Sequence, residues 1–295
     1  MSSPQPSARL DAALHGELVR SVEFALAEDI GKGDLTAGLI PASARASAQV
    51  ITREPAILCG QAWFSRCFTE LDPECSLRWQ AQDGDAVAAG ALLCTLEGSA
   101  RALLSGERSG LNFLQLLSGV ASKTQTYVDA LRGSKTRVVD TRKTIPGLRL
   151  AQKYAVKCGG GENHRLGLYD AILIKENHIL AAGGIAAALA AAQQIAAESA
   201  DRCRFIQVEV ESLEQLDEAL NAGASMILLD NMGLDSLRQA VNINAGRALL
   251  EASGNVHLAT LRAIADTGVD RISIGELTKH LCAIDLSLRL VTARV

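Results

Sequence analysis

The sequence predicts an α/β protein in which a parallel sheet, covered by helices, closes on itself as a barrel. From residue 136 onward, short apolar stretches alternate with segments of helical periodicity. Strands that lack a polar face are typical of a parallel sheet buried between helices. No G-x-G-x-x-G follows any of these stretches, which argues against a dinucleotide-binding open sheet. With about six strand–helix repeats, a barrel is the favoured closure.

The N-terminal half is predicted to be an α+β domain. Residues 11–27 form an amphipathic helix in this prediction, because leucine and valine recur on one helical face. Strand-like stretches follow at 48–52, 56–59, 77–81 and 92–96. Residues 105–132 have helical spacing and are expected to bridge the two halves, with Arg108 in the first turn. Residues 1–9 are expected to be a disordered tail.

The C-terminal half supplies the strands and helices of the barrel. The predicted strands are 136–140, 170–174, 205–210, 225–229, 248–252 and 271–274. One predicted helix begins at residue 148. The others span 180–200, 212–221, 234–241 and 257–265. Ser212 and Gln215 have the spacing of a capping box. The alanine-rich run 180–200 is interrupted by polar residues, which predicts one packed helix rather than a membrane span.

Composition excludes several classes of function. A chain of 295 residues that is 48% hydrophobic can bury a large core and form more than one domain. Only 3% of residues are aromatic and the net charge is -4, which argues against nucleic-acid binding. The seven cysteines are scattered without a C-x-x-C pair, as in a reduced cytoplasmic protein. The N-terminus lacks the apolar core of a signal peptide, so we expect a cytoplasmic protein that binds no membrane.

Charged and small residues gather where the predicted strands end. They are Asp140, Arg142, Lys143, Lys175, Glu209, Glu211, Asp230, Asn231, Glu251, Ser253, Gly254 and Gly275. In α/β barrels the C-terminal ends of the strands form the active-site face, so these side chains are expected at one mouth. Cations gathered in an acidic chain indicate a local anion site. There are alternatives to a functional site. Arg142 and Lys143 could be solvated loop charges, and Asp230 could simply start a turn.

This set of residue types suits two anionic substrates. Arginine forks bind carboxylates at two points, whereas lysine acts as a point charge on phosphate. The carboxylates could hold ribose hydroxyls, face a developing sugar cation or help to carry Mg²⁺. Glu209 and Glu211 lie two apart on one strand, so at least one should point into the mouth. Backbone N–H groups at Ser253, Gly254 and Gly275 are candidates for a phosphate site.

Several long motifs in this order closely resemble quinolinate phosphoribosyltransferases. They are DTRKTIPG, GGGENHR, LIKENHI, VEVES, LLDN, LEASGN and ISIGELT, preceded by EDIGKGDLT and SGERSGLN. The resemblance covers nearly the whole chain after residue 9. It implies an N-terminal sandwich domain at 10–118, joined by 282–295, and an incomplete α/β barrel at 119–281. The implied reaction joins quinolinate to phosphoribosyl pyrophosphate with Mg²⁺, giving nicotinate mononucleotide, pyrophosphate and CO₂ in a homodimer.

The resemblance also implies a role for each matching residue. Quinolinate carboxylates would be held by Arg142, His164, Arg165 and Lys175. Lys143 would lie between quinolinate and the phosphoribosyl group, and Glu211 and Asp230 would face the ribose and Mg²⁺. Lys143, Lys175, Glu211 and Asp230 are thus the catalytic candidates. Ser253, Gly254 and Gly275 would bind phosphate, and Arg108 would enter the site from the partner subunit. The chain departs from the family pattern at Ile145 and at Glu276.

Three alternatives remain on the sequence. Lys175 could form a Schiff base in an aldolase-type barrel. The chain could be a phosphate-binding barrel without catalysis, although carboxylates among the cations would weaken simple anion capture. It could also be a related phosphoribosyltransferase for another ring acid.

Overall fold

A computed structural model of the chain describes residues 12–199 and 202–294. The expected tail at 1–9 lies outside this part of the chain. The structure divides into two compact units. The first comprises Met1–Gln125, Thr144–Gly160 and His280–Val295, and the second comprises Thr126–Lys143 and Gly161–Lys279. The division thus falls within a helix at Gln125, and a segment after Lys143 groups with the N-terminal unit.

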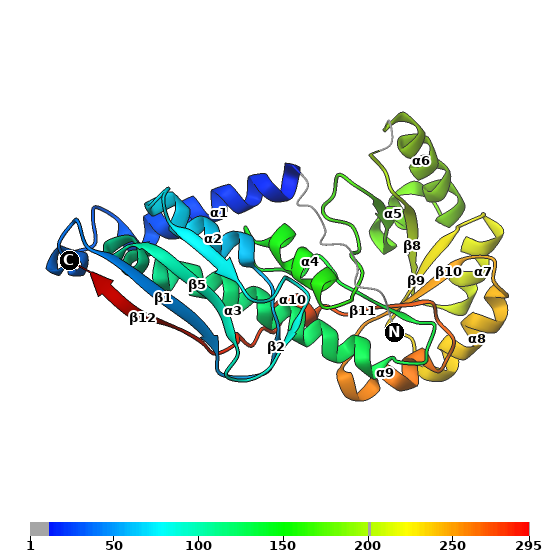
Figure 1. The fold of residues 1–295 in the computed structure, drawn as a ribbon. Helices are drawn as coiled ribbons and strands as arrows, with labels where there is room; N and C mark the ends of the chain where they lie inside the picture. Colours follow the sequence, from blue (N-terminus) through cyan, green and yellow to red (C-terminus); the bar gives the residue numbers. More distant parts are fainter. Residues whose placement is uncertain (1–11, 200–201, 295) are drawn as a thin grey trace. The chain divides into compact units, whose positions relative to one another are not determined.

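The first unit is built on an antiparallel sheet (Figure 1). Its strand order is β12-β1-β5-β3, with β1 at Arg45–Thr52, β3 at Ser76–Trp79, β5 at Leu92–Ser99 and β12 at Leu286–Arg294. Residues along β1 alternate between buried and more exposed, as expected for a sheet with one face on a core. The short strands β2 (Ala56–Ile57) and β4 (Ala86–Val87) pair separately. Strand β12 brings the C-terminal segment into this unit.

The first unit also contains helices. They are α1 (Ala12–Ile30), α2 (Gln61–Leu71), α3 (Ala100–Ala130) and α4 (Arg149–Cys158), with a short 3-10 turn η1 at Thr36–Leu39. The sequence interpretation missed α2, which buries Trp63, Phe64 and Phe68. At Gly106 and Gly110 of α3, an added Cβ would lie 3.1 and 3.0 Å from the Phe68 ring. These glycines let α3 pack directly on the aromatic side chains of α2.

The second unit contains a parallel sheet of six strands. The strands are β6 (Arg137–Val139), β7 (Ile172–Ile174), β8 (Ile206–Val210), β9 (Met226–Asp230), β10 (Leu249–Ser253) and β11 (Arg271–Ser273). Their order is β6-β11-β10-β9-β8-β7, so the first two strands in sequence lie at opposite edges. A closed barrel would pair β6 with β7, whereas in the described part of the chain β6 pairs with β11 and β7 pairs with β8. The fold is therefore an incomplete α/β barrel, as expected.

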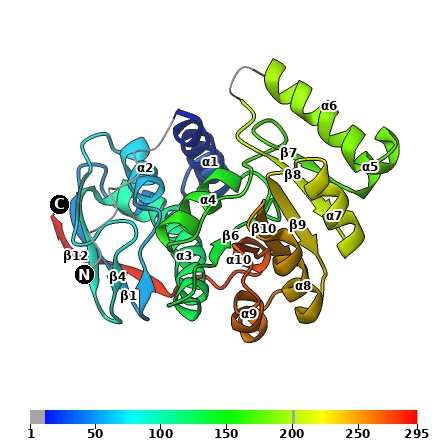
Figure 2. The ribbon, with the colours of Figure 1, turned by 90° about the vertical axis from the view of Figure 1, so that its right-hand side faces the viewer.

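Helices α7 (Leu213–Asn221), α8 (Leu234–Asn244), α9 (Leu258–Ala265) and α10 (Glu276–Lys279) follow these strands. Figure 2 shows α7, α8 and α9 flanking the strands that they connect. Strand register places residues of the same sheet face in rows, because parallel partners point the same way. One row joins Glu209, Leu228, Glu251 and Arg271. The next row toward the C-terminal ends pairs Asp230 with Ser253. The polar strand ends therefore share one face of the sheet.

The alanine-rich segment is not one helix, contrary to the sequence prediction. Helix α5 (Glu176–Ala182) ends at Gly183, which has a φ of 86°, and α6 (Ile185–Glu198) begins after Gly184. A glycine in the left-handed region is a typical helix end. Within residues 12–199 and 202–294, no single helix is long and apolar enough to cross a membrane. Over the same described residues, one pair of helices, α5 and α6, has that length and composition together, and the two are bent by 95°.

A second correction concerns Arg108. Helix α3 begins at Ala100, several residues before the expected start, so Arg108 does not lie in its first turn. The unfavourable interaction expected between this cation and the positive end of the helix dipole therefore does not arise.

Candidate active site

A cavity of about 530 Å³ opens at the C-terminal ends of the parallel strands. Its walls come from the strand ends and the loops that follow them. It is lined by Thr141, Arg142, Lys143, His164, Arg165, Leu173, Lys175, Glu209, Leu228, Asp230, Asn231, Glu251, Ser253, Gly254, Asn255 and Ser273. The lining follows the period of two along the strands, as at Leu228 and Asp230 on β9 and at Glu251 and Ser253 on β10. The sheet face that carries the polar rows is thus the floor of the cavity.

Lys175 directly follows β7, at the N-cap of α5, and is ion-paired within the cavity. Its Nζ lies 2.9 Å from Oε1 and 2.8 Å from Oε2 of Glu209 on the adjacent strand β8. The backbone N–H of Lys175 donates to Nδ1 of His178 in the first turn of α5, at 3.0 Å. This contact fixes the direction in which the lysine leaves the strand. A cation and a carboxylate therefore face the cavity as a pair.

Arg142 and Arg165 bring two guanidinium groups into the same cavity. Burial lowers the pKa of Arg165 from its ordinary value, and the neighbouring charge of Arg142 lowers this pKa further. Nε of Arg142 is buried and has no hydrogen-bond partner. Two like charges held together with an unused donor are stabilised when an anion lies between them. The geometry thus describes a binding site for a substrate with more than one negative group.

The segment that carries Arg165 is anchored at both ends by buried carboxylates. Asp140, at the end of β6, accepts hydrogen bonds from the His164 backbone N–H at 2.9 Å and from Asn163 Nδ2 at 2.7 Å. Asp170 accepts from the backbone N–H groups of the next turn at 2.9 and 3.0 Å, and Arg204 pairs with it at 3.1 Å. Between these anchors, both ring nitrogens of His164 contact protein groups: the Arg165 N–H and the Gln207 side chain. The loop is therefore held rigidly before any substrate binds.

Lys143 lies across the surface of Gly275. An added Cβ at Gly275 would lie 2.8 Å from Cδ of Lys143. The backbone of Lys143 is fixed separately, since its N–H donates to Thr141 Oγ1 at 3.0 Å and its carbonyl accepts from Thr278 Oγ1 at 2.8 Å. Gly275 itself is not among the residues that line the cavity. Its contact in the structure is with a lysine that does line it.

The loop after β10 has a conformation that few residues adopt. Gly254 has a φ of 97° and Asn255 a φ of 48°, and Asn231 after β9 has a φ of 53°. A Cβ at Gly254 would collide with the Asn231 side chain. Positive φ at residues other than glycine is uncommon and concentrates at functional sites. Asn255 Nδ2 donates to Asn231 Oδ1 at 3.3 Å, which ties the two loops together. Asp230, Ser253 and Gly254 line the cavity at this corner.

The cavity gathers most of the residues predicted from the sequence. Those in its lining are Arg142, Lys143, His164, Arg165, Lys175, Asp230, Ser253 and Gly254. Glu211 is not among them, and Glu209 takes the place expected for a carboxylate of β8. Strand β8 ends at Val210, and the Glu211 N–H donates to Gln215 Oε1 at 2.8 Å in the cap of α7. Glu211 is exposed there, because the cap turns the chain away from the strand direction.

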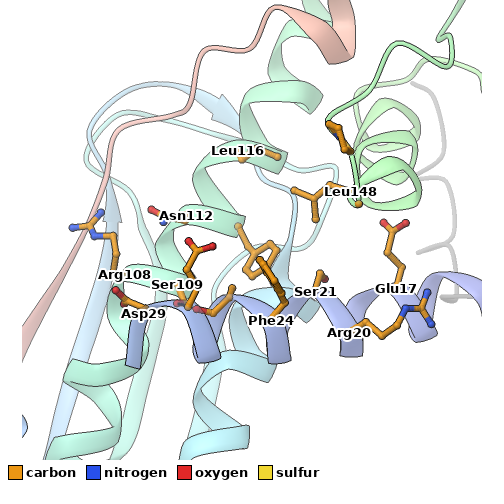
Figure 3. Close-up of a pocket in the computed structure, with 15 residues that line it drawn as sticks. Glu17, Arg20, Ser21, Phe24, Asp29, Arg108, Ser109, Asn112, Leu116 and Leu148 are labelled. Atoms are coloured by element: carbon orange, nitrogen blue, oxygen red, sulfur yellow. Dashed lines mark hydrogen bonds between the residues drawn. The ribbon is translucent and has the colours of Figure 1, made fainter. Parts of the chain in front are cut away.

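The structure places Arg108 in the first unit, where it lines a separate cavity of about 860 Å³. Figure 3 shows this cavity between α1, which carries Glu17, Phe24 and Asp29, and α3, which carries Arg108 and Asn112. Glu17 caps α4, since its carboxylate accepts from the N–H groups of Leu150 and Ala151 at 3.1 and 2.7 Å. Phe24 is 71% exposed, so one wall of the cavity is an uncovered aromatic ring. Arg108 is exposed as well.

Two polar residues at the floor of the cavity, Gln207 and Glu251, were assigned no role from the sequence. Glu251 and Gln207 are fully buried, and Gln207 Nε2 donates to Glu251 Oε2 at 3.3 Å. Arg271 Nε lies 3.8 Å from the same oxygen. Burial raises the pKa of the Glu251 carboxyl, and the charge of Arg271 partly offsets this effect. A signal for these residues existed in the sequence, because each interrupts an otherwise apolar strand.

Comparison with known proteins agrees with this geometry. Residues 34–118 match the N-terminal domain of quinolinate phosphoribosyl transferase, and residues 120–289 match its C-terminal domain. A probable nicotinate-nucleotide pyrophosphorylase [carboxylating] of Bacillus subtilis is 41% identical over 274 residues, which cover 93% of each chain. Nicotinate-nucleotide pyrophosphorylase [carboxylating] of Mycobacterium leprae is 40% identical over 277 residues, covering 92% of this chain and 96% of that one.

Solved structures show the same fold. The structure of the nicotinate-nucleotide pyrophosphorylase from Francisella tularensis superposes with a TM-score of 0.90 and 45% identity. The match covers 96% of this chain and 99% of that chain. The structure from Ehrlichia chaffeensis has a TM-score of 0.84 at 37% identity, covering 92% of this chain and 98% of that one. The two domain matches together span most of the sequence, and the chain belongs to the quinolinate phosphoribosyl transferase family.

Proposed function

We propose that the chain transfers the phosphoribosyl group of phosphoribosyl pyrophosphate to quinolinate and removes one carboxylate. The products are nicotinate mononucleotide, pyrophosphate and CO₂, in the biosynthesis of NAD. The observation that carries this proposal is the pair of neighbouring guanidinium groups at Arg142 and Arg165, with the buried and unpartnered Nε of Arg142. The relatives named above are described as pyrophosphorylases that act on nicotinate nucleotide with carboxylation, the reverse direction of the same reaction.

Quinolinate carries two adjacent carboxylates on a pyridine ring. Arg142 and Arg165 can each bind a carboxylate at two points, and Lys175 supplies a third cation. In the absence of substrate, Glu209 balances the charge of Lys175. Leu173 and Leu228 provide the apolar surface that a flat ring needs. The ring is thereby held in one orientation with its nitrogen free to react.

The phosphoribosyl group fits the other corner of the cavity. The backbone at Ser253 and Gly254 is suited to the 5′-phosphate. Lys143 is suited to bind the pyrophosphate or to lie between the two substrates. The carboxylates of Asp230 and Glu209 suit the ribose hydroxyls. Positioning two bound reactants in register supplies much of the rate enhancement.

A Mg²⁺ ion is expected with the pyrophosphate. Among the described residues there is no cluster of three or more His, Cys, Asp or Glu side chains that could hold a metal. The cavity carboxylates Glu209 and Asp230 fit a hydrated Mg²⁺, which is commonly held by one or two carboxylates together with substrate phosphates. Asp230 lines the cavity and is the carboxylate best placed to hold it, whereas a role for Glu211 would require contact through water. When bound, the ion would neutralise charge on the leaving pyrophosphate.

The proposed reaction has three steps: loss of pyrophosphate, attack by the ring nitrogen and loss of CO₂. The bond between the anomeric carbon and pyrophosphate breaks, and pyrophosphate leaves with the electron pair. The carboxylates at the ribose face stabilise the positive charge that develops on the sugar. The quinolinate nitrogen then uses its lone pair to bond the anomeric carbon, which makes the ring a pyridinium. When CO₂ leaves, its bonding pair remains on the carbon beside the cationic nitrogen, and a proton from water completes the product.

The principal competing function is a Schiff-base aldolase that uses Lys175. An aldolase lysine must attack a carbonyl as a neutral amine. Here the ammonium contacts both oxygens of Glu209, and Arg142, Arg165 and Lys143 line the same cavity. This arrangement suits the binding of polyanions better than carbonyl chemistry.

The proposed function is tested by product analysis. Quinolinate should be consumed only when phosphoribosyl pyrophosphate and Mg²⁺ are both present, and sodium borohydride should trap no substrate on the protein. If borohydride reduction instead left substrate covalently bound to Lys175 as a secondary amine, the aldolase would be supported. Turnover of nicotinate or another ring acid at a higher kcat/KM than quinolinate would identify a related phosphoribosyltransferase.

We further propose that the enzyme is a cytoplasmic homodimer whose sites include Arg108 of the neighbouring subunit. The support is that Arg108 is exposed and does not line the cavity that contains Arg142, Lys143, Arg165 and Lys175. Arg108→Ala and Lys175→Ala should each be inactive alone. In coexpressed mixed dimers one site carries both defects and the other is intact, so activity should return to about a quarter of wild type. No recovery in a sample shown to contain mixed dimers would refute the shared site.

A further inference from the structure

Gln207 lies within the parallel sheet, where polar side chains are rare. It is the second residue of β8 and is 0% exposed, on the same sheet face as Glu209. Its Oε1 lies 2.7 Å from Nε2 of His164, and its Nε2 lies 3.3 Å from Oε2 of Glu251. A fully buried amide with a partner at each end is costly to leave unsatisfied, so its orientation is strongly determined.

The backbone determines which protons this network carries. The N–H of Arg165 donates to Nδ1 of His164 at 2.8 Å. Because a backbone N–H can only donate, Nδ1 must be unprotonated, and the proton of the neutral ring is on Nε2. Nε2 therefore donates to Gln207, which must present its oxygen to the ring and its NH₂ group to Glu251. Donors then run in one direction from Arg165 through His164 and Gln207 to Glu251.

The contact of His164 with Glu251 fits the same assignment. Nε2 of His164 lies 3.7 Å from Oε1 of Glu251, which is beyond hydrogen-bond distance. The Gln207 amide lies between the two groups and carries the interaction. The ring also contacts Phe205 edge-on, with ring centroids 5.2 Å apart and planes at 89°. Both nitrogens of the imidazole and its ring thus contact other protein groups.

We infer that Gln207 is a positioning residue of the active site, which acts by holding His164 as the neutral Nε2–H tautomer. In that form Nδ1 accepts from the Arg165 N–H and fixes the peptide from which the Arg165 side chain enters the cavity. His164 therefore serves carboxylate binding through Arg165, rather than by donating to the substrate itself. Glu251 completes the chain by fixing the orientation of the Gln207 amide.

The inference deepens the proposed function and rests on it for the kinetic effect, but the tautomer can be measured without any substrate. Gln207→Met keeps the length and shape of the side chain and removes the acceptor. The KM for quinolinate should rise about tenfold or more, equivalent to about 1.4 kcal/mol, while the KM for phosphoribosyl pyrophosphate changes less than twofold. A merely structural role would move both values together.

A charge-conserving exchange provides the rescue. In the double variant Gln207→Glu with Glu251→Gln, residue 207 again offers an oxygen to His164, and the amide at 251 can donate to the other carboxylate oxygen. The quinolinate KM should return to within about threefold of wild type, a small effect on the free-energy scale. Gln61→Met is the matched control, because it removes the hydrogen bonds of Gln61 to Ala81 and Asp83 within the first unit. It should leave both KM values unchanged.

Nitrogen-15 NMR of histidine-labelled protein, assigned with His164→Asn, tests the geometry directly. The account predicts a protonated Nε2 and an unprotonated Nδ1 for His164 at neutral pH in the wild type. A proton on Nδ1 would overturn the inference, whatever the reaction. An unchanged quinolinate KM in folded Gln207→Met, or a failure of the exchange variant to recover while it remains folded, would overturn it as well. Absence of product with wild-type protein would instead refute the proposed function and leave the NMR result standing.

Discussion

The ammonium of Lys175 contacts both carboxylate oxygens of Glu209, at 2.9 and 2.8 Å. The pair joins adjacent strands at the mouth of the sheet, with the lysine side chain 42% exposed and the glutamate side chain only 10% exposed. Glu209 is therefore the fixed partner, and Lys175 is the one that can move toward a substrate. Glu211, the candidate from the sequence, is exposed and does not line the cavity, so we predict that Glu209 is the more important of the two carboxylates.

Glu209→Gln should lower kcat/KM strongly, whereas Glu211→Gln should change it less than about twofold. Loss of a charge-assisted contact in a partly buried site costs roughly 1.5–3 kcal/mol, or about a tenfold to hundredfold effect. Glu211 is exposed and contributes its backbone N–H to the helix cap, which the substitution preserves. Steady-state kinetics on the two variants decide the assignment. A larger loss in Glu211→Gln would restore the sequence-based choice.

Arg142→Lys should keep the charge and still lose most activity. A lysine cannot form the two-point contact of a guanidinium with a carboxylate, and each lost charge-assisted hydrogen bond is worth roughly 1.5–3 kcal/mol. The loss should appear mainly in the KM for quinolinate. Arg149→Lys is a suitable control, because Arg149 belongs to the first unit and does not line the cavity. Near-normal kinetics in Arg142→Lys would show that no bidentate contact forms there.

Gly275→Ala should leave the protein folded but displace Lys143. The added methyl group would lie 2.8 Å from Cδ of Lys143, and the flexible side chain must move to accommodate it. Misplacement of a catalytic group by about 1 Å can reduce the rate as much as a hundredfold. Gly38→Ala is the control, since a Cβ there meets no atom within 4 Å. If Gly275→Ala binds phosphoribosyl pyrophosphate less tightly but reacts at the normal rate once saturated, Gly275 acts in phosphate binding instead.

Glu251→Gln should change how stability depends on pH. Burial raises the pKa of this carboxyl in the folded protein above its ordinary value of 4.5, so the unfolded chain loses the proton first as the pH rises. The wild-type carboxyl therefore makes a growing unfavourable contribution to folding between the ordinary and the raised value. The melting temperature of the variant relative to wild type should rise as the pH is raised above 4.5, the ordinary pKa of the carboxyl. A difference in melting temperature that stays constant over this range would contradict the shifted pKa.

Local sequence patterns predicted the barrel strands because each is a short apolar run. They also predicted the polar mouth, since parallel strands bring their C-terminal ends together. The pattern could not choose between Glu209 and Glu211, because both have the same parity along β8. The choice depends on where the strand ends, and the hydrogen bond from Glu211 to Gln215 determines that.

Other differences have separate physical causes. The family resemblance placed residues 282–295 with the N-terminal domain, but local sequence patterns could not show that strand β12 would pair with β1. The break between α5 and α6 was visible as Gly183 and Gly184, but the alanine-rich composition on both sides suggested a continuous helix. The role of Gln207 depends on residues from three different segments, which only the folded structure brings together.

The central claim is that one cavity couples phosphoribosyl transfer to decarboxylation. The most direct measurement follows quinolinate labelled with carbon-13 in its 2-carboxylate, incubated with the wild-type protein, phosphoribosyl pyrophosphate and Mg²⁺. The account predicts that labelled CO₂, pyrophosphate and nicotinate mononucleotide form in equal amounts, with no labelled CO₂ when phosphoribosyl pyrophosphate is omitted. Release of labelled CO₂ without pyrophosphate, or a nucleotide product that retains the label, would contradict it.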